Sequence, residues 1–143
     1  MTTKDRNIAI LNWLSQCGEI ADIFCLVGEA KNDNTVFVPN VSEEWTKEFN
    51  DGTGEKELTF TLITYKDITT EPNTDDNAKA QFDVEKVMEW VREQNANSNY
   101  PQFADNETIF GIEVLENMPT MAGVDEKTAK FIFAVKINYY KGD

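Results

Sequence analysis

The chain has no histidine, only two cysteines and few basic residues. Without histidine it lacks the commonest general base and the commonest ligand of transition metals. Cys17 and Cys25 lack the C-x-x-C spacing of a redox or metal motif, so both are expected to be buried thiols. The 13 Lys and Arg residues are scattered among 26 Asp and Glu, and the net charge is −13. Such a surface repels phosphate backbones, which excludes tight nucleic-acid binding but lets DNA pass close by.

Long apolar runs and catalytic motifs are also missing. No stretch approaches the ~20 apolar residues that span a bilayer, and the N-terminus lacks a secretory pattern. We therefore expect no membrane partner and a protein made in a cytosol. There is no nucleophile elbow, P-loop, dinucleotide fingerprint or H-E-x-x-H motif, and no histidine to activate a serine. We predict no enzyme, no catalytic residues and no cofactor. The acidic pair Asp75 and Asp76 lacks the glycine and terminal glutamate of an EF-hand loop, so a solvated turn is favoured over a metal site.

The strongest pattern that is present is a long alternation near the C-terminus. Residues 128–140 place Phe131, Phe133 and Val135 on one face of a strand, together with the apolar residues that follow at the same spacing. A second alternating run, 108–115, is its expected partner, and the connection 116–127 carries turn-favouring residues. These runs predict a long hairpin in the middle of a sheet.

The remaining elements predict one α+β domain over residues 1–143. Helical periodicity covers 5–17, where Ile8, Leu11 and Leu14 mark an apolar face, and again 78–96. Residues 23–27 predict a buried strand that forms a hairpin with a strand at 35–39, and 57–65 alternates cleanly. The expected fold is a largely antiparallel sheet of about five strands flanked by two helices.

Residues 41–56 have the weakest pattern. Trp45 and Phe49 are four positions apart, which predicts a short helical turn with both rings on one face. Two interpretations stay open for this pair. The rings either plug the edge of the core or are exposed and mark a protein-binding patch.

Several C-terminal segments together form a recognisable pattern. They are the helix ending at residues 90–95, the Asn99-Tyr100-Pro101 break, the run 115–119 (LENMP) and a last strand with paired tyrosines. In these segments the chain resembles tail terminator (tail completion) proteins of long-tailed bacteriophages, often labelled minor capsid proteins in phages of Gram-positive hosts. The order of one helix and three strands upstream is similar to the lambda-type terminator fold.

The resemblance implies a virion protein, made in the host bacterial cytoplasm, that sits at the head–tail junction. Such proteins form a ring, commonly a hexamer, which ends polymerisation of the tail tube and offers a surface for head joining. Its expected partners are its own copies, the tail tube protein and a head–tail connector or stopper. A ring with this charge would have an acidic lumen through which DNA slides without adhering.

Loop length and aromatic content, rather than the family pattern, suggest where contacts lie. We expect protein contacts at Trp45 and Phe49, in the acidic loop from Asp67 to Asp76 (including Asp75), and in the connection 118–126, which holds Met118 and Met121. Two other functions remain alternatives. One is another connector protein, a stopper or an adaptor; the other is a small acidic cytosolic protein that binds a basic partner.

Overall fold

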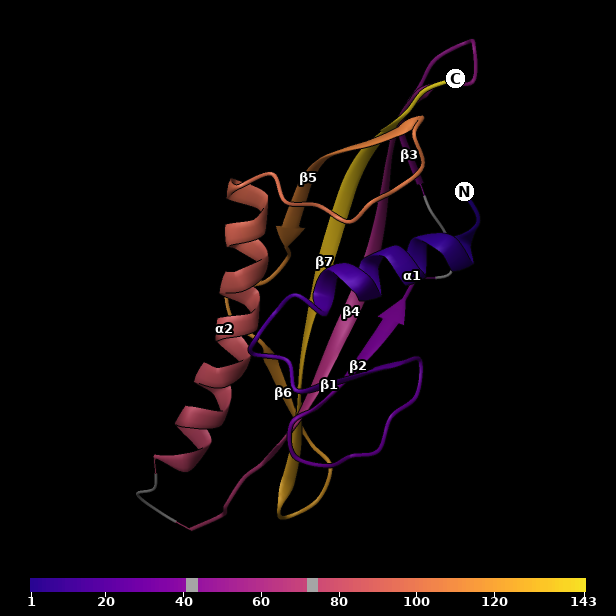
Figure 1. Cartoon of the computed structure of the whole chain (residues 1–143). Coiled ribbons are helices and arrows are strands. Elements are labelled where there is room, and N and C mark those ends of the chain that lie inside the picture. The colour runs from indigo at the N-terminus through magenta and orange to yellow at the C-terminus, as the bar shows by residue number, and fades with distance from the viewer. Residues whose placement is uncertain (41–43, 72–74) are drawn as a thin grey trace.

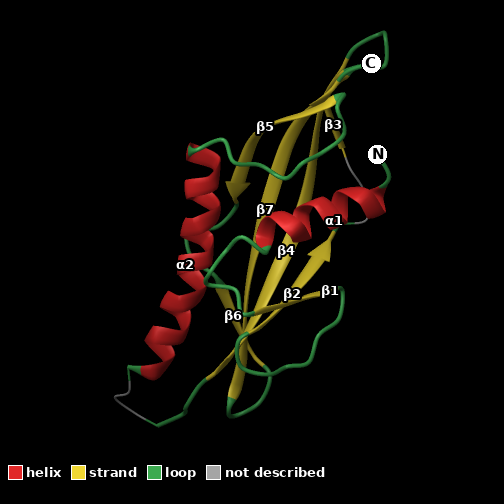
Figure 2. Cartoon of the chain, viewed as in Figure 1, coloured by secondary structure: helices red, strands yellow, loops and turns green. Residues whose placement is uncertain are grey.

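A computed structural model describes residues 1–40, 44–71 and 75–143 of the chain (Figures 1 and 2). In these residues it has two helices and one mixed sheet of seven strands, so the α+β class is confirmed and the strand count is higher than expected. The elements in chain order are α1 (Thr3–Leu14), β1 (Asp22–Cys25), β2 (Asn34–Pro39), β3 (Glu44–Glu48), β4 (Gly54–Asp67), α2 (Asp76–Ala96), β5 (Glu107–Val114), β6 (Thr120–Gly123) and β7 (Thr128–Lys141).

The sheet is built on the antiparallel pair of β4 and β7. The two strands have 14 residues each and pair along their whole length, from Gly54 opposite Lys141 to Asp67 opposite Thr128. The sheet order is β1-β2-β4-β7-β5, so β7 lies in the middle as predicted, whereas its partner β5 is an edge strand. All described pairs except β1 with β2 are antiparallel, so the sheet is mixed and fits the largely antiparallel prediction only roughly.

The expected hairpin connection 116–127 contains a short strand, β6. Within it, β6 pairs with the first part of β7 and continues the edge that β5 begins. Between the two strands the Glu116 carboxylate accepts the Ala134 N–H at 3.0 Å, and this contact replaces a missing ladder hydrogen bond. The actual turn is only residues 124–127, where Asp125 accepts the N–H of Thr128 at 2.7 Å.

The segment 22–39 differs from its prediction in two respects. β1 and β2 are parallel rather than a hairpin, because the chain loops back through residues 26–33 before β2 begins. β1 is also mostly exposed instead of buried, and Cys25 is an exposed thiol. An apolar run in sequence is typical of a strand covered on both faces, but β1 lies at the end of the sheet order, where it has one neighbouring strand.

Both helices cover the same face of the sheet (Figure 1). The core lies between them and the inward residues of β7, as the alternation predicted, and Cys17 is buried in it. Trp13 of α1 and Trp90 of α2 join the helices, with ring centroids 4.9 Å apart. Helix α1 begins at a capping box in which Thr2 and Asp5 exchange hydrogen bonds. Its predicted apolar face is correct except for Ile8, which is exposed.

A buried ion pair fixes α1 to the start of β5. The guanidinium of Arg6 donates to Glu107 through Nη2 at 3.0 Å and through Nε at 3.3 Å. The same guanidinium lies over the Tyr139 ring, 5.7 Å from its centroid. The other end of β5 contacts α2, where the Asn95 side chain accepts the Ile112 N–H at 2.9 Å. The helices therefore clamp β5 from both of its ends.

Candidate interaction surfaces

Most of the predicted contact residues lie toward opposite ends of the long β4–β7 pair. β3, which carries Trp45, pairs with the first four residues of β4, and Phe49 follows directly after it. Asp67 ends β4, and Met121 of β6 lies opposite Phe131 near the start of β7. A 14-residue strand is about 45 Å long at ~3.3 Å per residue. The structure thus separates most of the sequence-predicted residues into two surfaces, and Met118 lies between these ends, in the step from β5 to β6.

The first surface is the hairpin of β3 and β4. Residues 44–48 are a strand rather than the expected helical turn, because the extended start of β4 offers a free edge with which they pair. Trp45 is 37% exposed and Phe49 is 42% exposed, so neither ring is core. Each ring faces a lysine of the same hairpin, with Lys56 Nζ 4.8 Å from the centroid of Trp45 and Lys47 Nζ 5.3 Å from that of Phe49.

The turn that supports these rings is tightly built. Asp51 accepts hydrogen bonds from the Thr53 hydroxyl at 2.6 Å and the Thr53 N–H at 3.1 Å, and these bonds lower the pKa of the Asp51 carboxyl. Gly54 has a φ of +151°, and a Cβ there would lie 2.0 Å from the Lys47 carbonyl oxygen. Only glycine fits at this position without moving the backbone. The aromatic pair is therefore presented on a fixed hairpin.

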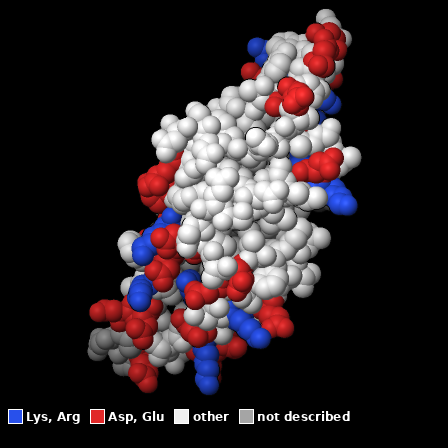
Figure 3. All heavy atoms as spheres, viewed as in Figure 1, with Lys and Arg blue, Asp and Glu red and all other residues white. Residues whose placement is uncertain are grey.

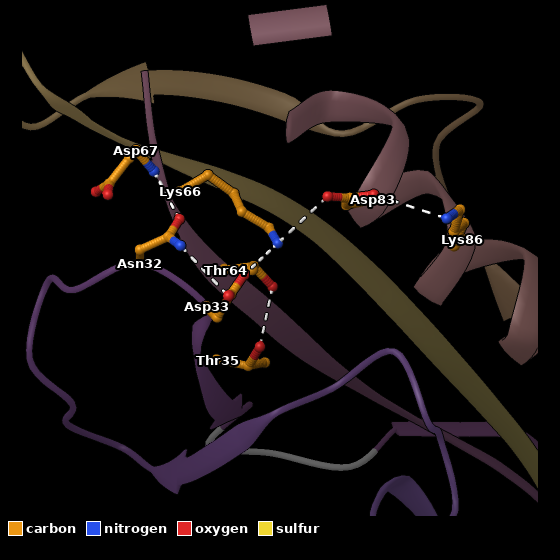
Figure 4. Close-up of polar contacts among 8 residues, drawn as sticks. All are labelled: Asn32, Asp33, Thr35, Thr64, Lys66, Asp67, Asp83 and Lys86. Carbon is orange, nitrogen blue, oxygen red and sulfur yellow. Dashed lines mark hydrogen bonds and ion pairs between the residues drawn. The ribbon is translucent and has the colours of Figure 1, made fainter. Parts of the chain in front are cut away.

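The second surface surrounds Lys66, at the other end of β4 (Figure 4). The Lys66 side chain is nearly buried, donates to Asp33 and lies 3.8 Å from the carboxylate of Asp83 on α2. The Asn32 side chain accepts the Asp67 N–H at 2.8 Å. These contacts tie the loop before β2, the end of β4 and the first turns of α2 together. A polar hollow of about 400 Å³ opens beside them, lined in part by Asp67 and Asp76.

The charged groups beside this hollow already pair with one another. The Lys66 ammonium lies between the carboxylates of Asp33 and Asp83. In the described part of the chain no group of three or more metal-ligating side chains is placed to hold a metal ion. Asp75 directly precedes α2 and makes no side-chain capping bond. The acidic loop prediction thus falls on an exposed, polar end of the molecule, although residues 72–74 lie outside the described residues.

The methionines of the predicted third region are exposed along the β5–β6 edge. Met118 lies in the step between the two strands and Met121 lies in β6, and both side chains are more than half exposed. Leu115 and Val124 extend this apolar strip. The Arg92 guanidinium of α2 donates to the Glu116 carbonyl at 3.1 Å and holds the step in place. Exposed methionines suit contacts with irregular partner surfaces, because the thioether side chain adapts its shape.

Comparison with known proteins provides no family for this chain. A scan against known protein families and a search of curated proteins found no match. In the described residues no helix is both long and apolar enough to cross a membrane.

Sequence reasoning missed one exposed apolar surface. Phe24, Leu26 and Val27 are exposed, and Val27 is the most open of them at 81%. The run 23–27 reads as a buried strand because its residues are apolar without alternation. Only its place at the end of the sheet order, beside β2 alone, exposes it.

Proposed function

We propose that this protein is a phage tail terminator, a virion protein of the head–tail junction. Its copies form a ring, six being the commonest number in the family it resembles. The ring caps the head-proximal end of the tail tube and stops tube polymerisation. Its other face takes the head–tail connector or stopper, so its partners are its own copies, the tube protein and the connector.

The observation that supports this proposal best is the separation of the candidate surfaces. A subunit placed between a tube and a connector needs two contact surfaces that point in opposite directions. Here the Trp45–Phe49 hairpin lies at one end of the β4–β7 pair, and Asp67, Asp76 and Met121 lie near the other end. The continuous pairing of two 14-residue strands holds these ends at a constant distance.

The charge of the chain is compatible with a ring through which DNA passes. A net charge of −13 disfavours adhesion of a phosphate backbone to the lumen. Asp and Glu residues gather toward both ends of the face shown in Figure 3. A three-dimensional reconstruction of the ring tests this step, because a basic lumen would contradict it.

Two alternatives belong to different classes. A stopper is expected to be a small closed β-barrel, whereas this sheet is open, with β1 and β5 at the ends of its order and two helices on one face. A small acidic protein that binds a basic partner is favoured by the net charge alone. Such a protein needs no ring, so its assembly state separates it from a terminator.

The first experiment is the mass of the purified protein by light scattering over a concentration series, followed by negative-stain imaging. Ring-shaped particles with an open lumen are expected at high concentration or on the end of a tail tube. A compact dimer with no lumen would contradict the proposal and favour the acidic adaptor.

A further inference from the structure

Two long uncharged runs of the chain lie side by side. Residues 7–18 and 94–104 contain no Asp, Glu, Lys or Arg, although these types make up 27% of the sequence. The Trp13 indole N–H donates to the Asn99 carbonyl at 2.8 Å, and the Asn99 amide donates to Gln16 at 3.0 Å. Figure 3 shows the result as a broad band without charge in the middle of the face, between ends that carry charges of both signs.

A groove lies in this uncharged region, between α1 and residues 99–102. Its volume is about 390 Å³, and Ile8, Asn12, Tyr100 and Pro101 are among its lining residues. Ile8 is an apolar side chain of α1 that the core leaves exposed. The charged side chain at the groove is Asp5, whose carboxylate already accepts the Thr2 N–H at 3.2 Å. We call this surface the α1 groove.

Apolar side chains are exposed at the end of β1 and directly after it. The side chains of Phe24, Leu26 and Val27, named here the 24–27 cluster, are exposed within a run, 23–28, that carries no charge. The Val27 N–H donates to the Cys25 carbonyl at 2.9 Å around Leu26, which has a φ of 70°. Such a γ-turn is rare for a residue other than glycine and costs backbone strain. The strained turn leaves two apolar side chains facing solvent.

We propose that the 24–27 cluster of one copy docks in the α1 groove of the next copy, an inference that rests on the proposed ring. Copies with a charge of −13 repel one another, so they approach at lowest cost where both surfaces lack charge. The cluster is apolar, and the hollow of about 570 Å³ that Phe24 and Val27 line beside it also holds Glu29 and Lys31, whose opposite charges pair with each other. The groove is concave, and its charged side chain, Asp5, lies at one end. Because the two surfaces differ, the contact is heterologous, and repeated contacts of this kind close into a ring or extend as a filament.

The exposed Cys25 allows a direct test by cross-linking. A short bismaleimide should join native Cys25 of one copy to a thiol introduced by Asn12→Cys in the groove of the next. Cys17 is buried and should not react in the folded protein. The matched control is Glu89→Cys, which adds an exposed thiol on α2, outside both surfaces. Asn12→Cys should give a severalfold higher yield of cross-linked species, including a ladder above the dimer, and Cys25→Ser should remove it. Equal yields from the two introduced thiols would overturn the inference.

Charge insertion provides a second, independent readout. Val27→Glu alters a side chain that is almost fully exposed, so the fold should be retained while the concentration needed for self-association rises severalfold. Phe82→Glu, which adds the same charge at another exposed apolar residue, on α2 and outside both surfaces, should leave it unchanged. Rings that persist in Val27→Glu would overturn this contact and leave the terminator proposal standing. Compact dimers without a lumen would instead count against the terminator proposal, whatever the cross-linking yield.

Discussion

Removing the buried Arg6 charge should destabilise this protein far more than removing an exposed one. The Glu107 side chain is 1% exposed and that of Arg6 is 10% exposed, with 3.0 Å between Nη2 and Oε2. In Arg6→Met the carboxylate stays in a site from which water is excluded, and its desolvation is no longer compensated by the guanidinium. Breaking a buried pair in this way typically costs about 3–5 kcal/mol. That is a large part of the roughly 5–15 kcal/mol by which a domain is stable.

The assay is equilibrium unfolding in urea, followed by tryptophan fluorescence. With a slope of about 2 kcal/mol per molar, the midpoint of Arg6→Met should fall by roughly 2 M. The double variant Arg6→Met/Glu107→Leu should recover most of the loss, since no unpaired charge remains. The matched control is Lys31→Met, which breaks an exposed pair with Glu29 and should leave the midpoint nearly unchanged, because water screens that pair. If Arg6→Met costs no more than Lys31→Met, the reasoning about this pair is wrong.

Three further predictions follow from the exposed surfaces and the turn. Replacing Trp45 and Phe49 by Ala should weaken assembly in light scattering while circular dichroism shows a folded chain, because both rings are partly exposed; an unfolded product would show them to be structural. A thiol reagent should modify Cys25 rapidly in the native protein and Cys17 only after unfolding, because burial raises the pKa of the Cys17 thiol; two equally fast thiols would contradict this. Gly54→Ala should lower the free energy of unfolding by about 1–3 kcal/mol in a thermal melt, because the added Cβ would clash with the Lys47 carbonyl oxygen. An unchanged melting temperature would refute this.

The elements with strong periodicity could be predicted from the sequence. The alternation at 128–140 correctly identified β7 and its core face, and the helical spacing at 78–96 identified α2 to within two residues at its start. These patterns are reliable because each element buries one face against the core, and burial imposes the period. The pairing of 108–115 with β7 followed from the same logic.

The elements at the sheet edges could not be predicted in the same way. β1 has apolar residues but little cover, and β3 has polar residues yet forms a strand because β4 offers it an edge. At an edge, pairing depends on which backbone groups remain free nearby, and a local sequence window does not contain that information. The parallel register of β1 with β2 is a further example.

The candidate contact surfaces show the same division. Composition alone determined that copies of the chain repel one another and repel phosphate groups, because net charge is a sum over residues and does not depend on the fold. The sequence also contained the uncharged runs 7–18 and 94–104. Only the tertiary structure decided that these two runs share a face and that the 24–27 cluster is exposed. It also placed Trp45 and Asp67 toward opposite ends of the long strand pair. The physical reason is that burial and neighbourhood arise from long-range packing, which brings together side chains that are far apart in the chain.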